Sequence, residues 1–84
     1  MEGRRVYKFG GQHDLLTGEY GCWRDTWYAV TPNGHCANLA DREVIEHADG
    51  TITVSPSIEV SASQDGKQVR VYQGFLERGV WREA

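Results

Sequence analysis

The chain has 84 residues, the size of one small domain, so residues 1–84 are expected to fold as a single unit. Its composition is that of a globular protein, with 39% hydrophobic and 25% charged residues. The formal net charge of −3 argues against non-specific nucleic-acid binding, for which a basic surface is expected. No apolar run resembles a secretory signal or a membrane span, so we expect a cytoplasmic protein without a membrane partner.

The N-terminal part predicts one strand followed by a long loop. Residues 5–9 read as a strand, with Tyr7 and Phe9 on the same face, and two glycines then end it. Residues 10–22 show no regular hydrophobic period, which predicts a loop-rich segment with at most one helical turn, around Asp14. Loops of this length are often mobile or functional.

The middle of the chain predicts three further strands. Residues 23–30 are aromatic and β-branched, which suits a strand. The Pro-Asn-Gly sequence at 32–34 predicts a turn into a short returning strand over residues 35–40. Residues 41–47 are compatible with a short helix, but the Ala-Asp-Gly sequence at 48–50 favours a strand that enters a hairpin.

The C-terminal part contains the clearest pattern of the chain. Residues 51–62 alternate between polar and apolar side chains, which predicts a strand with one buried and one wet face. The apolar positions of this run are Ile52, Val54, Ile58, Val60 and Ala62. Pro56 lacks an N–H, so the strand should lie at a sheet edge or break there with a bulge. Hairpin turns are predicted at 64–66 and 77–79, each followed by another strand.

Together these elements predict an all-β fold. The expected architecture is a small antiparallel meander, sandwich- or barrel-like, with at most one short helical turn.

The metal-binding residue types do not form a recognisable motif. A structural zinc site usually combines two pairs of closely spaced ligands, whereas the only close pair here is His35 and Cys36, whose side chains would point to opposite faces of a strand. Neither a metal nor a cofactor is therefore predicted, although a site built from Cys22, Cys36 and one histidine stays geometrically open. Otherwise the two cysteines are expected to be small buried thiols.

Catalytic motifs are also missing from the sequence. The chain has no nucleophile elbow, phosphate-binding loop or dinucleotide glycine pattern, and a meander of this length leaves little room for a deep pocket. A non-enzymatic protein is therefore predicted.

The aromatic residues favour a binding function. The chain has nine aromatic side chains (three Trp, four Tyr and two Phe), more than one small sheet face is expected to bury. Trp, Tyr and Arg dominate the energetics of protein interfaces, so we predict a partner-binding surface from these residue types. Its candidate residues are Trp23, Arg24, Trp27, Tyr72, Arg78 and Trp81. The alternatives are that most of these rings belong to the core, or that rings and arginines together stack nucleic-acid bases.

Several segments resemble a family of small, uncharacterised bacterial and bacteriophage proteins. The family pattern is C-P-N-G-H, then a D-G-T strand that runs into S-P-S-[IV], then a closing G-x-L-x-x-G-x-W hairpin. It is matched by Thr31–His35, Asp49–Ile58 and Gly74–Trp81, so the resemblance spans the C-terminal two-thirds and leaves residues 1–25 uncovered. Some members look like zinc ribbons whose motif cysteine is a metal ligand.

This chain departs from that pattern at the metal-ligand position. It has Thr31 where the motif has cysteine, and no cysteine follows Cys36, so a four-cysteine ribbon cannot form. The resemblance implies no activity.

The resulting expectation is a phage or prophage accessory protein that binds a protein partner in the host-cell cytoplasm, for example by inhibiting a host or defence factor. A homodimer formed through an unpaired sheet edge is also expected to be accessible to such a meander. The alternatives are a nucleic-acid-binding module that uses exposed aromatics and arginines, or a degenerate zinc-ribbon-like structural domain.

Overall fold

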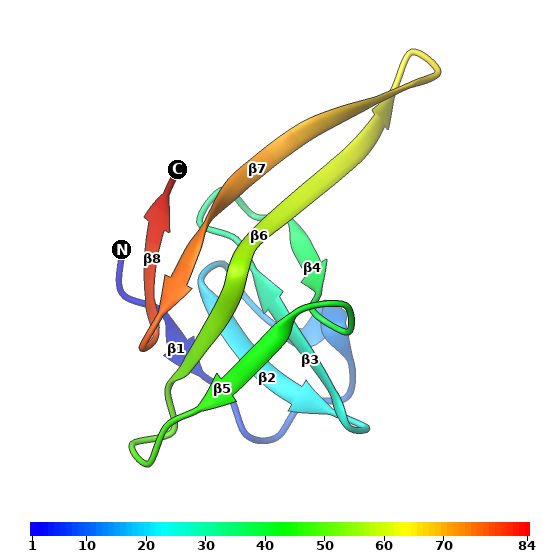
Figure 1. Cartoon of the computed structure of the whole chain (residues 1–84). Helices are drawn as coiled ribbons and strands as arrows, with labels where there is room; N and C mark the ends of the chain where they lie inside the picture. The colour runs from blue at the N-terminus through cyan, green and yellow to red at the C-terminus, as the bar shows by residue number, and fades with distance from the viewer.

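A computed structural model describes residues 1–84, apart from the side chain of Gln12, and has two four-stranded sheets that pack against each other (Figure 1). The first sheet has the order β1-β2-β3-β4: β1 (Arg4–Arg5), β2 (Glu19–Trp23), β3 (Thr26–Val30) and β4 (Cys36–Asn38). The second has the order β5-β6-β7-β8: β5 (Glu43–Glu46), β6 (Ile52–Gln64), β7 (Lys67–Glu77) and β8 (Val80–Glu83). The predicted all-β fold is therefore confirmed in its sandwich form, since neither sheet closes into a barrel among the described residues.

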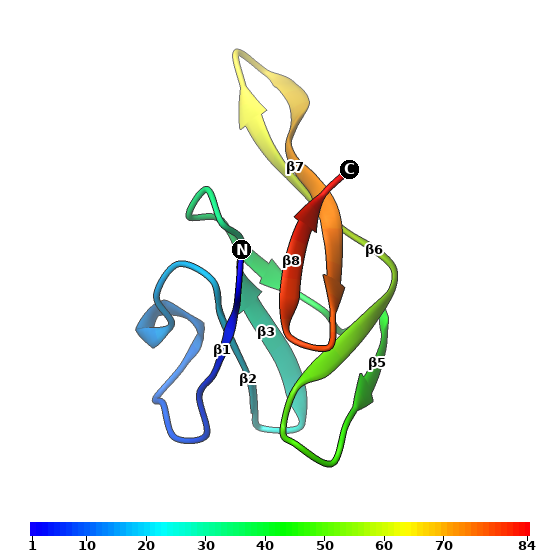
Figure 2. The ribbon, with the colours of Figure 1, turned by 90° about the vertical axis from the view of Figure 1, so that its left-hand side faces the viewer.

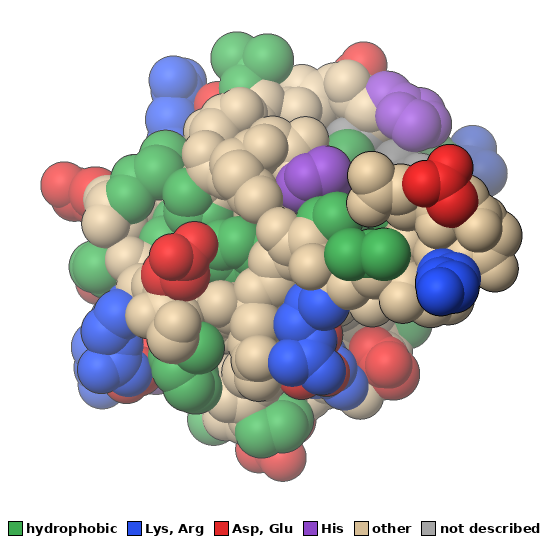
Figure 3. Space-filling model, turned by 90° about the horizontal axis from the view of Figure 1, so that it is seen from above, with side chains coloured by type: hydrophobic (Ala, Val, Ile, Leu, Met, Phe, Trp, Pro, Cys, Tyr) green, Lys and Arg blue, Asp and Glu red, His purple; other side chains and the backbone are tan. Residues whose placement is uncertain are grey.

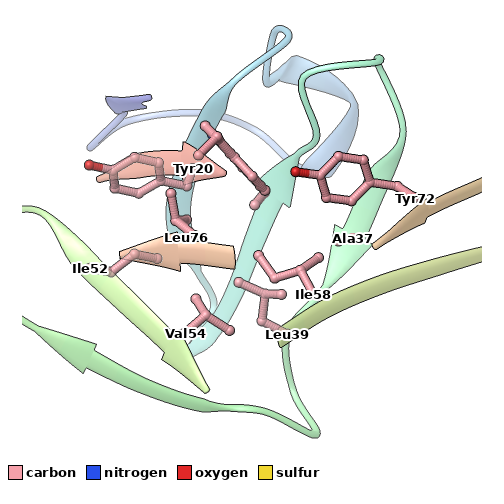
Figure 4. Close-up of a cluster of buried hydrophobic side chains, with 10 residues drawn as sticks. Tyr20, Ala37, Leu39, Ile52, Val54, Ile58, Tyr72 and Leu76 are labelled. Carbon is pink, nitrogen blue, oxygen red and sulfur yellow. The ribbon is translucent and has the colours of Figure 1, made fainter. Parts of the chain in front are cut away.

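The core lies between the two sheets. Apolar side chains from both sheets meet there and point toward one another (Figure 4). The buried members are Tyr20, Ala29, Ala37, Leu39, Ile52, Val54, Ile58, Tyr72, Leu76 and Trp81. The alternation predicted over residues 51–62 is confirmed, because Ile52, Val54 and Ile58 are buried in this core and Val60 packs against it, while the polar positions face outward; Ala62 continues the alternation beyond the core.

Pro56 shows how β6 accommodates a residue without an N–H. The pairing of β5 with β6 ends at the Glu43–Ser55 pair, and no residue of β7 is paired with Pro56 either, so no ladder hydrogen bond requires its missing N–H. On the other side, the register between β6 and β7 shifts between Val54 and Ile58. β6 is thus central only as far as Ser55 and an edge strand beyond it, so Pro56 lies at a sheet edge and also within a register irregularity, and the strand does not break in two.

The strand predicted over residues 5–9 is wrong beyond its first residue. β1 covers only Arg4–Arg5 and runs parallel to β2, and its ladder ends where Val6 N donates to Tyr20 O. The chain then leaves the sheet edge and Phe9 packs on the outer face of β2 against Gly21, where a Cβ would lie 2.5 Å from the Phe9 ring. Tertiary packing therefore overrides the local alternation.

The predicted loop over residues 10–22 is confirmed only in its first part. It contains a single turn of 3-10 helix, η1 (Gln12–Asp14), beside the first sheet (Figure 2), and Leu15 directly after this turn is buried. β2 begins at Glu19, so the end of the predicted loop is strand. No helix among the described residues is long and apolar enough to cross a membrane.

The strand predicted over residues 23–30 is wrong as a single element. The chain reverses at Arg24 and Asp25, whose φ angles of 51° and 65° make a two-residue hairpin turn between β2 and β3. Glycine, asparagine or aspartate usually occupies such positions, and Asp25 without a neighbouring glycine was too weak a turn signal to be recognised. The hairpins predicted at 48–50, 64–66 and 77–79 are all confirmed, as are the strands before and after them.

β6 and β7 continue beyond the two packed sheets as a two-stranded arm (Figures 1 and 2). We define the arm as residues 61–70, which are all exposed except for the half-buried Ala62. Its tip is the turn at Asp65 and Gly66, with φ angles of 51° and 76°.

Candidate functional site

Two of the predicted binding residues belong to the core. Tyr72 and Trp81 are 5% and 2% exposed, and their rings meet edge to face with centroids 6.0 Å apart. Trp81 Nε1 also donates a hydrogen bond of 3.0 Å to the carbonyl oxygen of Gly18, which ties β8 to the segment before β2. These two residues are therefore removed from the binding surface, because the sandwich needs both rings to fill its interior.

Two further candidates lie apart from the rest. Arg78 is exposed in the turn between β7 and β8, with a φ of 46°, and its N–H donates to Thr53 Oγ1. Trp27 lies on the core side of β3, half-buried, with the guanidinium carbon of Arg5 4.7 Å from its ring centroid. The structure therefore does not gather the six predicted residues into one surface.

A shallow depression of about 300 Å³ lies beside Trp27. Leu39, Val44 and Arg42 are among the residues that line it. The Arg42 guanidinium is already engaged, since Nε donates to the Ser57 carbonyl oxygen at 2.7 Å and its other nitrogens lie 3.6 Å from carboxylates. The depression therefore offers no unengaged cation to a ligand.

Trp23 and Arg24 do form a shared surface, together with a third residue. The Arg24 guanidinium carbon lies 4.7 Å from the centroid of the Trp23 ring. The centroids of the Trp23 and Tyr28 rings are 6.2 Å apart, and the two ring planes meet at 57°. We call these three residues the Trp23 surface. Both rings are half-buried and Arg24 is exposed, so part of each ring faces solvent.

The strand register explains why these rings lie outside the core. Gly21 pairs with Tyr28 and Trp23 pairs with Thr26, so these residues share the outer face of the β2–β3 hairpin. The core residues Tyr20 and Ala29 have the opposite parity. The sequence analysis did not predict that Tyr28 faces outward. That prediction requires the turn at residues 24–25, which decides the face of the sheet on which each residue of β3 lies.

The Trp23 surface is supported from below by the N-terminal segment. A Cβ at Gly11 would lie 3.9 Å from the Trp23 ring, which is ordinary contact, and Phe9 covers the neighbouring Gly21. The ring is thus contacted by the N-terminal segment and by Arg24, and it stays partly exposed. A partly fixed aromatic surface loses little conformational entropy when a partner covers it.

The potential metal ligands are not brought together. Cys22 pairs with Trp27, and Cys36 pairs with Val30, so the two thiols project from opposite faces of the first sheet on strands that β3 separates. Within the described residues, no group of three His, Cys, Asp or Glu side chains is close enough to hold a metal ion.

The shifted ionisable groups lie away from the Trp23 surface. Burial raises the pKa values of Tyr20 and Tyr72 in the core. Hydrogen bonds from the hydroxyl and N–H of Thr51 lower the pKa of Asp49, in the turn between β5 and β6. These shifts have structural causes, and the chemistry that the Trp23 surface offers is stacking, apolar contact and hydrogen bonding.

The charges elsewhere on the surface are mixed. On the face shown in Figure 3, Lys and Arg side chains alternate with Asp and Glu side chains and do not gather into one region. Several arginines also lie beside carboxylates, including Arg70 at 3.5 Å from Glu59 and Arg5 at 2.8 Å from Glu46. The chain matches no protein-family model, no curated protein and no solved structure.

Proposed function

We propose that this protein is a non-enzymatic accessory protein that binds a protein partner through the Trp23 surface. The observation that carries the proposal is the cluster of Arg24, Trp23 and Tyr28, in which the guanidinium lies over the Trp23 ring and the Tyr28 ring packs against it at a tilt, on the outer face of the first sheet. These are the three residue types that are most enriched among interface hot spots. A half-exposed Trp that contributes nothing to the inter-sheet core is well suited to contact another protein.

The distribution of the other aromatic residues supports this choice. Tyr20, Tyr72 and Trp81 are buried in the core, and the partly buried Trp27 packs against it. The two rings of the Trp23 surface lie on the opposite side of the sheet, so removing them would leave the main core intact. Their position there suits binding to a partner better than stabilisation of the fold.

The biological setting in the proposal rests on the sequence resemblance alone. The motifs at Thr31–His35, Asp49–Ile58 and Gly74–Trp81 resemble a family of small bacterial and bacteriophage proteins. We therefore propose a phage or prophage origin, a cytoplasmic partner in the host cell, and inhibition of a host or defence factor as the consequence of binding.

The test compares proteins captured from host lysate by tagged wild-type protein and by matched surface variants. Trp23→Ala removes the central ring, and Ile45→Ala is the control because Ile45 is 46% exposed on β5 of the other sheet. We expect a protein that wild type and Ile45→Ala enrich equally and that Trp23→Ala enriches about tenfold less, as for the loss of a hot-spot residue. Equal enrichment by all three proteins would contradict the proposal.

A second candidate function is single-stranded nucleic-acid binding by the same surface. The observation in its favour is the cation on the Trp23 ring, because aromatic and guanidinium planes both stack on bases. Fluorescence anisotropy with a labelled oligonucleotide at several salt concentrations separates the two candidates. A phosphate-contacting surface loses affinity steeply with salt, whereas a protein-directed surface shows no measurable oligonucleotide binding.

A further inference from the structure

The arm leaves backbone hydrogen-bonding groups open along both of its edges. β5 pairs with β6 only as far as Ser55, and β8 pairs with β7 only from Gly74 onward. Between those limits the two strands pair only with each other, and nearly every arm residue is exposed. A two-stranded ribbon in water is marginally stable at best, so additional pairing along one edge would stabilise it.

The turn at the tip fixes which backbone groups point outward. In a two-residue hairpin the flanking pair, here Gln64 and Lys67, is the hydrogen-bonded one, and the pattern then alternates along the strand. The N–H and C=O groups of Ser63, Ser61 and Glu59 therefore point away from β7.

Two observed hydrogen bonds agree with this alternation. The carbonyl oxygen of Ser57, next in the outward series, accepts from Arg42 Nε on the side away from β7. The carbonyl oxygen of Gln73, which is opposite Glu59, accepts from Ala84 N on the side away from β6. The open part of the β6 edge thus begins directly after the position that Arg42 covers.

The two edges of the arm differ in how well they are protected. The β7 edge carries Lys67 and Arg70, together with the register irregularity opposite Val60 and Ser61. Lysines, other charges and bulges are the usual devices that prevent strand addition. The β6 edge from residue 59 to residue 63 carries one charge, Glu59, and has no lysine: its sequence is Glu-Val-Ser-Ala-Ser.

We propose that the β6 edge of the arm pairs with the same edge of a second copy of this chain. An antiparallel arrangement about a two-fold axis at Ser61 places Ser61 opposite Ser61 and Glu59 opposite Ser63. Because each of these residues directs both of its backbone groups outward, the three mutual pairs form hydrogen bonds on every outward group from residue 59 to residue 63. The result is a four-stranded arm in the order β7-β6-β6-β7.

Side chains in this register are compatible on both faces. Val60 lies opposite Ala62 on the inner face, and no two like charges lie directly opposite each other on the outer face. The register also places Asp65 of one copy opposite Ser57 of the other, where Arg42 covers the edge.

This inference is independent of the proposed function, since it uses β6 and leaves the Trp23 surface free. Sedimentation velocity over a concentration series tests it with two matched variants. Ser63 and Gln68 are directly opposite each other in the arm, and both direct their N–H groups outward, but toward different edges. Ser63→Pro therefore blocks the β6 edge and Gln68→Pro blocks the β7 edge, while neither removes a hydrogen bond between β6 and β7.

We expect wild type and Gln68→Pro to sediment at twice the 9.5 kDa chain mass and to share one dissociation constant. We expect Ser63→Pro to raise that constant by about tenfold or more, because each dimer loses two backbone hydrogen bonds. A monomeric wild type at every concentration overturns the proposal. Equal dimerisation of all three proteins, or loss of the dimer in Gln68→Pro alone, overturns it as well.

A crosslinking experiment tests the register without a proline substitution. In a Cys22→Ser, Cys36→Ser background, Ser61→Cys places two thiols across the two-fold axis, where Cα atoms of a hydrogen-bonded pair are about 5.5 Å apart and within disulfide range. Arg70→Cys is the control, since it adds two strand spacings to that distance. We expect a disulfide-linked dimer from Ser61→Cys only, and equal or absent crosslinking of both variants overturns the register.

Discussion

The guanidinium of Arg5 lies 2.8 Å from the carboxylate of Glu46, and this ion pair joins β1 of the first sheet to the β5–β6 hairpin of the second. The same nitrogen donates to the carbonyl oxygen of Gly50 at 2.8 Å. The guanidinium also stacks on Trp27 and on Tyr7, at 4.7 Å and 4.3 Å from the ring centroids. Arg5 thus connects the sheets through polar contacts at one side of the apolar core.

Replacing Arg5 by Ala is expected to destabilise the fold by about 2 kcal/mol, since hydrogen bonds to a charged group and two ring contacts are lost while the half-exposed Glu46 partner is partly screened. Arg4→Ala is the matched control, because Arg4 is 81% exposed and lies 3.9 Å from Glu19, and it should change stability by less than about 0.5 kcal/mol. Urea denaturation of both variants measures the difference. Equal effects would show that Arg5 does not connect the sheets.

The two tryptophans at residues 81 and 23 are expected to behave differently on truncation. Trp81→Ala removes a 2% exposed ring and the donor to Gly18, so the loss should be about 3–5 kcal/mol, enough to unfold a domain of this size. Trp23→Ala removes a half-exposed ring from the outer face and should cost about 1 kcal/mol. Circular dichroism melts of both variants check the order. A Trp81→Ala variant as stable as wild type would show that the core is assigned wrongly.

Tyr72→Phe is expected to stabilise the protein by about 1 kcal/mol. The Tyr72 hydroxyl is buried without a hydrogen-bond partner among the described residues, and an unsatisfied buried polar group is costly. Burial raises the pKa of Tyr72, with a smaller contribution from the nearby Glu83 carboxylate. Folded Tyr72 therefore keeps its proton at pH values where the unfolded chain has lost it.

The consequence for wild type is a stability that is fully present below about pH 10, the ordinary tyrosine value, and that falls as the pH rises above it. Tyr72→Phe should lose less stability than wild type over the same alkaline range, although Tyr20 still contributes. Urea midpoints at neutral and alkaline pH measure both effects. A destabilised Tyr72→Phe would indicate that the hydroxyl has a partner.

The elements that the sequence predicts well are those whose signal is local. The period of two over residues 51–62 and the glycine turns at Gly66 and Gly79 depend on neighbouring side chains and on φ preferences. The β2–β3 turn was missed because Arg24 and Asp25 adopt positive φ without a glycine or asparagine.

The binding surface was harder to predict, because exposure is a tertiary property. Trp81 and Trp23 are indistinguishable by composition, yet one faces the opposite sheet and the other faces away from it. Without that turn, the sequence could not predict that Tyr28 lies on the same face of the hairpin as Trp23. Only the relative position of the two sheets decides which rings are core.

Asp25→Gly is expected to stabilise the β2–β3 hairpin by about 0.5–1 kcal/mol, because glycine adopts the φ of 65° without steric cost. The substitution keeps Arg24 and its contact with Trp23, so partner binding should be unchanged. Thermal melts measure the stabilisation, and the lysate capture described above measures binding. Asp41→Gly, at another exposed aspartate, serves as the comparison. A variant less stable than wild type would mean that the Asp25 carboxylate holds the turn by itself.

Site-specific photo-crosslinking from position 25 tests the proposed function most directly. A photoreactive phenylalanine derivative replaces the exposed Asp25 next to Arg24, which keeps all three residues of the Trp23 surface, and the same derivative replaces the exposed Ile45 on β5 as the control. After irradiation in host cells, the Trp23 surface as a protein-binding site predicts a discrete crosslinked protein from position 25 and none from position 45. The same crosslinked protein from both positions, or none from position 25, would contradict it.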